Sequence, residues 1–244
     1  MTNLATALVA AAERYPQRTA VRAGELGLTW AELDDLTARV AGGLFAHGVR
    51  AGDPVGLRVP DVPAFPVLHF GVLRAGAVVV PLTPGPVTAR LQLLFSTPEE
   101  TRDPEGAEPR VEGAGAGSGA VQVGPEFLDQ LAFWPRRPEI AHVSDDDPAV
   151  LLDAADTWYH GHSASALTHG DLRENAVAAA AALRAEGATQ RVVVFPCTGR
   201  SYGLGTVLLA GACLGAAGPP CPIPRQPAAP QGAQCHRRVR VRSS

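Results

Sequence analysis

The residues whose types and spacing could do chemistry lie in a polar segment at 153–165, which reads DAADTWYHGHSAS. A short apolar run at 149–152 precedes it and predicts a buried strand, and apolar residues recur at helical spacing from Thr168 onward. A loop between such a strand and helix aims its backbone N–H groups, together with the positive end of the helix dipole, at one place. This frame predicts a site for an anion such as phosphate.

The residue types inside the loop fit a phosphate site poorly. Loops that hold phosphate use glycine for close backbone approach, and lysine, serine or threonine for charge and hydrogen bonds. The segment 153–165 has one glycine, two aspartates and two bulky aromatics, Trp158 and Tyr159. All 21 basic residues of the chain are arginine. Any mechanism that needs a lysine ammonium is therefore excluded for this chain alone.

Composition sets the class of protein. With 244 residues, 46% of them hydrophobic and 18% charged, the chain can bury one sizeable core or two small ones. No apolar run reaches the roughly 18 residues of a membrane span. Glu13 and Arg14 lie where a signal peptide would be apolar. We therefore expect a cytoplasmic protein. Four cysteines without a C-x-x-C pair indicate free thiols. The net charge of -3 predicts no general attraction to nucleic acid.

Alternating strand and helix signals predict an α/β fold with mainly parallel sheets. Thr29 and Glu32 have the spacing of a capping box, and apolar residues then recur at helical spacing until Gly48. Further along, a strand, a helix and a strand within about thirty residues indicate a βαβ unit and hence a parallel pair, whose two faces the helices at 30–47 and 62–74 could cover. In order, we expect helix 4–14, strand 19–22, turn 24–27, helix 30–47, strand 54–59, helix 62–74 and strand 77–82.

Periodicity weakens beyond residue 87. The run at 96–120 is rich in glycine, proline and charge, which predicts a flexible loop. We expect four parts: a first α/β subdomain at 1–95, a flexible loop at 96–124, a second partial α/β segment at 125–216 and a disordered basic tail at 217–244. The other expected elements are helices 88–95, 125–133 and 204–214, strands 149–152 and 191–195, and the helix that opens near Thr168.

Three motifs occur together in the first part: LTWAEL at 28–33, GVRAGDPVGL at 48–57 and GVLRAGAVVVPLTP at 71–84. With them the chain resembles the opening of the adenylate-forming superfamily of acyl-CoA synthetases, peptide-synthetase adenylation domains and luciferases. ALTHGDLRENA at 166–176 is similar to the helix start that follows the phosphate loop of that family, and the stretch 194–216 looks like its next strand and helix. The resemblance covers residues 1–85 and 147–216.

The resemblance implies an incomplete N-terminal domain of an ATP-dependent ligase. In that family, magnesium-ATP and a small carboxylic acid give an acyl-adenylate and pyrophosphate, and a thiol, usually coenzyme A (CoA), then takes the acyl group. Tyr202 and Gly203 would line the acyl pocket, although they could also merely begin a core helix. The residues of the degenerate loop whose types still suit nucleotide binding are Thr157, Gly161, Ser163 and Ser165.

The departures from the family pattern are large. The family loop ends in Pro-Lys-Gly, whereas here Asp153 and Asp156 would repel a triphosphate. Pro196 is followed by Cys-Thr-Gly-Arg instead of the family's Pro-x-x-His pattern, and the magnesium-binding Glu and the lysine-bearing C-terminal domain have no counterpart. We expect a truncated chain with little or no turnover, and we hypothesise that a frameshift produced its tail. The alternative is a non-catalytic remnant or interaction module that self-associates through an open sheet edge.

Other sites stay open as weaker alternatives. His160 and His162, with His169, could form a metal cluster, although a solvated loop is the simpler interpretation. The acidic run at 145–147 could chelate magnesium or form an acidic turn before a strand. The serines of the loop lack the glycines of a nucleophile elbow, which argues against a hydrolase. The arginines at 237–242 could contact nucleic acid, but no aromatic residues lie among them.

Overall fold

The structure, a computed structural model, describes residues 3–23, 26–59, 64–82, 91–98, 119–151 and 166–185. Helices and strands alternate along these residues, which confirms the predicted α/β class. None of the described helices is long and apolar enough to cross a membrane. The strand expected at 191–195, the helix expected at 204–214 and the tail expected at 217–244 lie outside the described residues.

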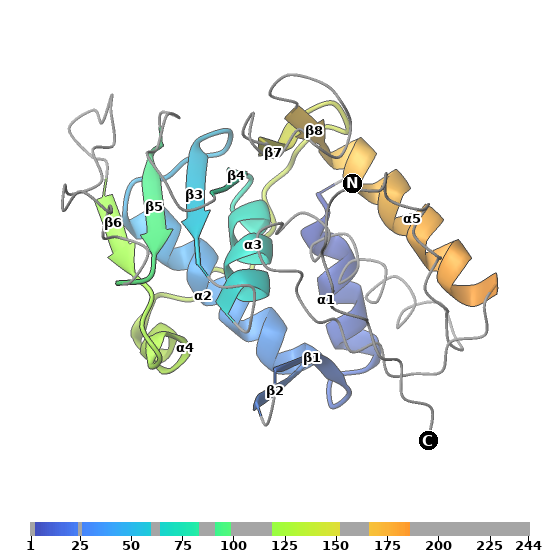
Figure 1. Cartoon of the computed structure of the whole chain (residues 1–244), viewed down its shortest axis with the longest axis horizontal. Helices are drawn as coiled ribbons and strands as arrows, with labels where there is room; N and C mark the ends of the chain where they lie inside the picture. The colour runs from blue at the N-terminus through green and yellow to red at the C-terminus, as the bar shows by residue number, and fades with distance from the viewer. Residues whose placement is uncertain are drawn as a thin grey trace, which may run out of the picture.

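A mostly parallel sheet forms the centre of the described structure (Figure 1). Its six strands lie in the order β6-β5-β3-β4-β7-β8. The first five run parallel to one another, and β8 is antiparallel to β7. The chain continues from β3 to β4 on one side and then places β5 on the other side, so the strand order reverses at β3. The bounds are β3 Pro54–Arg58, β4 Val78–Pro81, β5 Leu93–Ser96, β6 Gly119–Gln122, β7 Pro148–Leu151 and β8 Ala166–Thr168.

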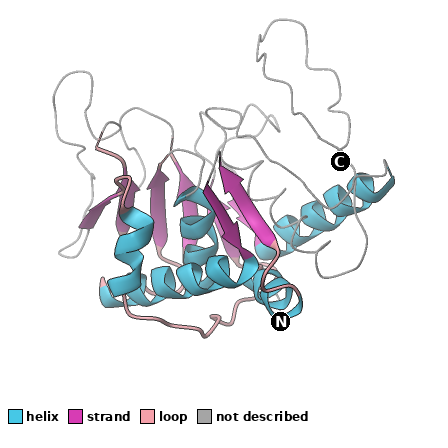
Figure 2. Cartoon of the chain, turned by 90° about the horizontal axis from the view of Figure 1, so that it is seen from below, coloured by secondary structure: helices cyan, strands magenta, loops and turns pink. Residues whose placement is uncertain are grey.

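Three helices, α1 Ala5–Arg14, α2 Trp30–Ala46 and α3 Ala64–Arg74, gather along one side of the strands (Figure 2). Helix α2 begins where the sequence predicts because Thr29 and Glu32 form a capping box. Glu32 N donates to Thr29 Oγ1 at 3.2 Å, and Thr29 N donates to Glu32 Oε2 at 2.7 Å. The helix ends before Gly48, whose φ of 83° lies in the left-handed region.

Helix α3 is buried on all sides because it lies between the sheet and α2. All of its residues are buried, and Gly71 permits the close approach of α2, since a Cβ there would lie 2.4 Å from Val40 Cγ1. The expectation that α2 and α3 cover opposite faces of the sheet is therefore wrong, because α2 packs on α3. On the other face, the described residues form a smaller apolar cluster of Val80, Leu91 and Leu94.

Short elements account for the other differences from prediction. The expected turn at 24–27 is partly a strand, because β1 Thr19–Ala23 and β2 Leu26–Thr29 pair as an antiparallel hairpin. The helix expected at 88–95 is wrong at its end, where β5 pairs in parallel with β3, and β6 occupies part of the loop expected at 96–124. A short apolar run fits a buried strand or a buried helix equally well, so pairing with neighbouring strands decides.

The remaining expected elements are present. Helix α4 Phe127–Gln130 and the 3₁₀ turn η1 Leu131–Phe133 lie at the helix expected at 125–133. Strand β7 lies at the expected strand 149–152, and α5 His169–Ala185 begins near Thr168 as predicted. Strand β8, just before α5, is an addition that the sequence analysis missed.

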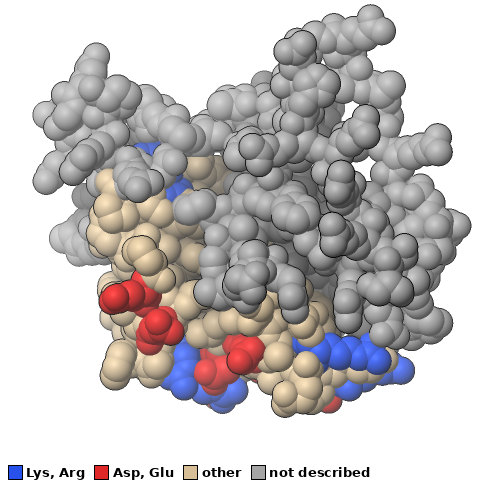
Figure 3. Space-filling view, turned by 60° about the horizontal axis from the view of Figure 1, so that its bottom comes forward, with Lys and Arg blue, Asp and Glu red and all other residues tan. Residues whose placement is uncertain are grey.

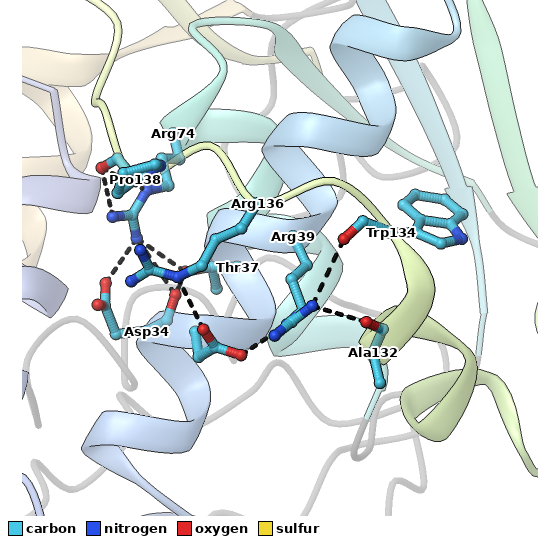
Figure 4. A network of polar contacts seen from close by, with 9 residues as sticks. Asp34, Thr37, Arg39, Arg74, Ala132, Trp134, Arg136 and Pro138 are labelled. Atoms are coloured by element: carbon cyan, nitrogen blue, oxygen red, sulfur yellow. Dashed lines mark hydrogen bonds and ion pairs between the residues drawn. The ribbon is translucent and has the colours of Figure 1, made fainter.

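A buried ion pair fixes the extended segment 134–144 across α2 and α3 (Figure 4). The Arg74 guanidinium donates from Nη2 to Pro138 O at 2.6 Å and pairs through Nη1 with Asp34 Oδ1 at 2.5 Å. Its side chain is 3% exposed. Because water screens such a pair weakly, Arg74 ties α3, α2 and the segment together.

A second ion-pair network lies at the surface of the same segment. Asp35 accepts from Arg39 Nε at 2.6 Å and from Arg136 Nε at 2.8 Å. The two arginines lower the pKa of the Asp35 carboxyl through hydrogen bonds and charge, against a desolvation that raises it. Asp35 and Arg136 are 41% and 44% exposed, so we assign this network a small stabilising role.

Candidate functional site

The segment with the predicted chemistry leaves the sheet at the end of β7 and returns at the start of β8. Leu151 and Ala166 are partners in the β7–β8 register, so the two ends of 152–165 lie side by side at the carboxyl edge of the parallel strands. The segment itself is outside the described residues, as are both expected acyl-pocket residues. The assigned site residues therefore stay predictions: Thr157, Gly161, Ser163, Ser165, Tyr202 and Gly203.

Helix α5 does not begin at that edge. From the segment 152–165 the chain first runs back along β7 as strand β8, until Thr168 pairs with Pro148 (Figure 1). Three strand residues span roughly 10 Å. Helix α5 therefore begins near the amino end of β7, and the prediction that the loop and the helix dipole converge on one spot is wrong. The physical reason is β8, because its antiparallel pairing with β7 carries the chain away from the carboxyl edge of the sheet before α5 begins.

The first N–H groups of α5 already have acceptors. His169 N donates to Asp147 O at 3.1 Å, and Gly170 N donates to Asp145 O at 2.9 Å. The next N–H group donates to Thr168 Oγ1 at 3.0 Å. These are the groups that bind an anion at an open helix N-terminus. This end of α5 is closed to a phosphate.

The acidic run at 145–147 forms a turn before β7, which is one of its two predicted roles. The Arg173 guanidinium donates two hydrogen bonds to the Asp145 carboxylate, of which Nη2 to Oδ2 is 3.0 Å. These bonds lower the pKa of the Asp145 carboxyl and raise the pKa of the Arg173 guanidinium. Asp147 Oδ2 accepts from Ser144 N at 2.6 Å. Across the described ranges, no three His, Cys, Asp or Glu side chains gather as metal ligands.

His169 is a core residue. Its side chain is fully buried, and its Nδ1 accepts a hydrogen bond from Leu4 N at 3.4 Å. The interpretation of His169 as part of a solvated loop is therefore wrong, because the first turn of α5 packs against the start of α1. The other two histidines of the suggested metal cluster, His160 and His162, lie outside the described residues.

Two buried polar side chains at the carboxyl edge of the sheet escaped the motif analysis. Arg58 ends β3, the strand at which the order reverses, and is in register with Ser96 at the end of β5. An arginine and a serine at neighbouring strand ends are residue types suited to an anion, but both residues already have interaction partners. The sequence signal for Arg58 is its position as the one charged residue in the strand PVGLRV.

In the view of Figure 3, acidic side chains lie beside basic ones on the described part of the face. This part of the surface shows no patch of one sign that would attract nucleic acid. The arginines at 237–242 lie outside the described residues.

Sequence comparison finds relatives for the first part of the chain. Residues 8–97 match the family described as AMP-binding enzyme. The salicyl-AMP ligase / salicyl-S-ArCP synthetase of Mycobacterium tuberculosis is 43% identical over 94 residues, which are 36% of this chain and 17% of the relative. A feruloyl-CoA synthase of an Amycolatopsis species is 49% identical over 71 residues, 29% of this chain and 14% of the relative. The chain spans less than a fifth of the length of these two relatives.

Solved structures share the fold over most of the chain. A benzoate CoA ligase from Burkholderia xenovorans aligns with a TM-score of 0.72 and 22% identity, over 88% of this chain and 44% of its own. The apo structure of MbtA from Mycobacterium smegmatis aligns with a TM-score of 0.67 and 26% identity, over 87% of this chain and 42% of its own. These likenesses confirm the predicted α/β architecture, which here corresponds to less than half of each solved chain.

Proposed function

We propose that this chain carries the scaffold of a ligase for carboxylic acids. The premise is that its N-terminal part belongs to the AMP-binding family of adenylate-forming enzymes. The family match over residues 8–97 carries this proposal. Its three motifs lie on the elements that build the centre of the fold, from β2 and α2 through β3 to α3 and β4. We propose further that turnover by this chain alone is negligible.

The proposed reaction is the ATP-dependent activation of a small carboxylic acid to an acyl-adenylate, followed by transfer to the thiol of CoA. Magnesium would accompany the ATP. The attack of a carboxylate on a phosphate brings two anions together, so cations and oriented N–H donors must neutralise the charge. In this chain the hydroxyls and backbone of the segment 152–165 would have to supply those donors, with Thr157, Gly161, Ser163 and Ser165 as the proposed contacts.

Three features of the chain predict weak binding of ATP. Asp153 and Asp156 place negative charge in the same segment, and no lysine is present anywhere. The closed N-terminus of α5 adds no free N–H groups. We therefore propose that this chain binds ATP, magnesium and CoA weakly. Tyr202 and Gly203 stay our proposal for the acyl side, and the cytoplasm stays our proposed location.

The test combines an activity assay with a binding assay. Acid-dependent release of pyrophosphate from magnesium-ATP is measured with benzoate, salicylate and ferulate as probes, and we expect none above a heat-inactivated control. Release well above that control would overturn the proposed inactivity. The thermal midpoint is measured with and without magnesium-ATP, because a ligand that binds only the native state must raise it.

A charge variant tests the reason for weak binding. We expect D153N/D156N to bind magnesium-ATP more tightly than the native chain, since two repelling charges are removed. The double variant D129N/D146N, at two exposed positions, is the matched control because it changes the net charge by the same amount. Equal affinity of all three proteins would remove the charge argument.

A second candidate function is a non-catalytic module that associates with its own kind. Among the described strands, β6 ends the sheet, and its Ala120 and Gln122 are exposed. An open edge strand offers backbone groups for pairing with another chain. This function predicts concentration-dependent association in sizing chromatography that Ala120→Lys weakens. A monomer at every concentration would contradict it.

A further inference from the structure

Two buried histidines that the proposed function does not use lie in the core of the molecule. His69 is on α3 and is 3% exposed, and His169 is the first residue of α5 and is 0% exposed. Within the described part of the chain, His69 Nδ1 and His169 Nε2 are buried without a hydrogen-bond partner. Buried polar groups normally have partners, so a buried pair of this kind calls for an explanation.

The hydrogen bond to Leu4 fixes where His169 can take up a proton. Nδ1 accepts from Leu4 N at 3.4 Å, so the proton of the neutral ring is on Nε2. A second proton can bind only at Nδ1. It would place an N–H donor against the Leu4 N–H, and the bond that holds the start of α1 to the start of α5 would be lost.

His69 is surrounded by apolar rings. Its imidazole stacks on Phe65 at 5.7 Å and meets the edge of Phe70 at 5.5 Å between centroids. Burial, together with a smaller contribution from positive charge on His169, lowers the pKa of His69 to about 4. A proton on one of the two rings therefore disfavours a proton on the other.

The acidic groups near His169 do not reverse this preference. Burial lowers the pKa of His169, while Asp147 and Asp145, from the turn before β7, oppose the shift. Asp145 is already paired with Arg173 from α5 itself. In the folded chain both rings are neutral at neutral pH.

We propose that the two buried histidines act as a proton-sensitive latch. In neutral form they keep the bond between the starts of α1 and α5 intact, and protonation in mildly acidic medium releases it. The inference rests on the histidines alone and does not depend on the proposed function. A released histidine takes up a proton near its ordinary pKa of about 6.5. The latch is therefore fully stabilising above that pH, and its contribution falls as the pH drops toward 4.

The first experiment measures urea unfolding of the whole chain from pH 7.0 to pH 4.5. For the native chain, the unfolding equilibrium constant should rise by about 50-fold from His69 alone over this range. The variant His69→Phe, which suits its aromatic neighbours and cannot titrate, should lose that part of the pH dependence. The variant His142→Asn, at an exposed histidine, should behave like the native chain. Equal slopes for the native chain and His69→Phe would overturn the latch.

The second experiment uses the native chain and remains decisive if His69→Phe fails to fold. The backbone amide signal of Leu4 and the ring signals of both histidines are followed by NMR over the same pH range. The latch predicts that the Leu4 amide changes together with protonation of His169. An unchanged Leu4 amide while both rings titrate would overturn it, as would ordinary titration of His69 in a fully folded chain.

Discussion

Helices α2 and α5 begin alike but are held differently. Each has 17 residues, and each starts with a threonine that exchanges hydrogen bonds with an acidic residue three positions later. Over their first ten residues, which the structure describes in both helices, α2 has one exposed residue and α5 has five. The same local start therefore leads to different exposure.

The difference shows that capping and packing decide separate properties. A cap sets the residue at which a helix begins, whereas packing of the apolar face supplies most of the stability of a helix in a protein. Helix α5 also exposes Val177, at 56%, so the apolar residues of its described first part do not all lie on one buried stripe. We expect α5 to open at a lower free energy than α2.

Truncation of one buried leucine in each helix tests this expectation most directly. Leu33 of α2 is 0% exposed and Leu172 of α5 is 3% exposed. Leu33→Ala should destabilise the whole chain by about 3 to 4 kcal/mol, because the closely packed residues around Leu33 cannot move into the cavity. Leu172→Ala should cost about 2 kcal/mol, because α5 can settle into the space. Urea unfolding measures both.

Hydrogen exchange distinguishes local from global effects in these variants. In Leu172→Ala we expect faster exchange in α5 and unchanged exchange in α2, since α5 opens by itself. In Leu33→Ala exchange should rise throughout. Equal losses of stability with identical exchange patterns would mean that the two helices belong to one cooperative unit, and the contrast between them would fail.

The Arg74–Asp34 ion pair also distinguishes α2 from α5, because it links α2 to the buried helix α3. Arg74→Leu leaves the Asp34 carboxylate, whose side chain is 20% exposed, without its buried partner. We expect a loss of about 2 to 3 kcal/mol, below the range for fully buried pairs because water reaches Asp34. The matched control is Arg136→Ala, which breaks the exposed pair with Asp35 and should cost less than about 1 kcal/mol. Similar losses in both variants would show that burial does not matter here.

The sequence was most informative where several local signals agreed. The capping box, the apolar stripe and Gly48 together predicted α2 almost residue by residue. The βαβ unit was predicted for a similar reason, since two apolar runs flanked a clear helix. Where local signals agree, little is left for tertiary context to change.

The sequence was least informative where pairing decides the structure. The run LLFS at 93–96 could not be assigned without its neighbour β3, and three residues of β8 gave no strand signal of their own. Missing β8 had a consequence for the candidate site, because it moved the start of α5 away from the loop at 152–165. The burial of His169 was equally invisible, since it depends on contact with Leu4 from the other end of the described chain.

Removal of the two capping threonines gives the smallest expected effects and the finest comparison. Thr29→Ala should cost about 1 kcal/mol, because the N–H of Glu32 loses its acceptor. Thr168→Ala should cost about half as much. The preceding N–H groups of α5 keep the carbonyl oxygens of Asp147 and Asp145 as acceptors, so the start of the helix stays fixed. Thr→Ser at each site retains the hydroxyl and is the control in thermal unfolding. A larger loss at residue 168 than at residue 29 would mean that capping, rather than packing, holds α5 in place.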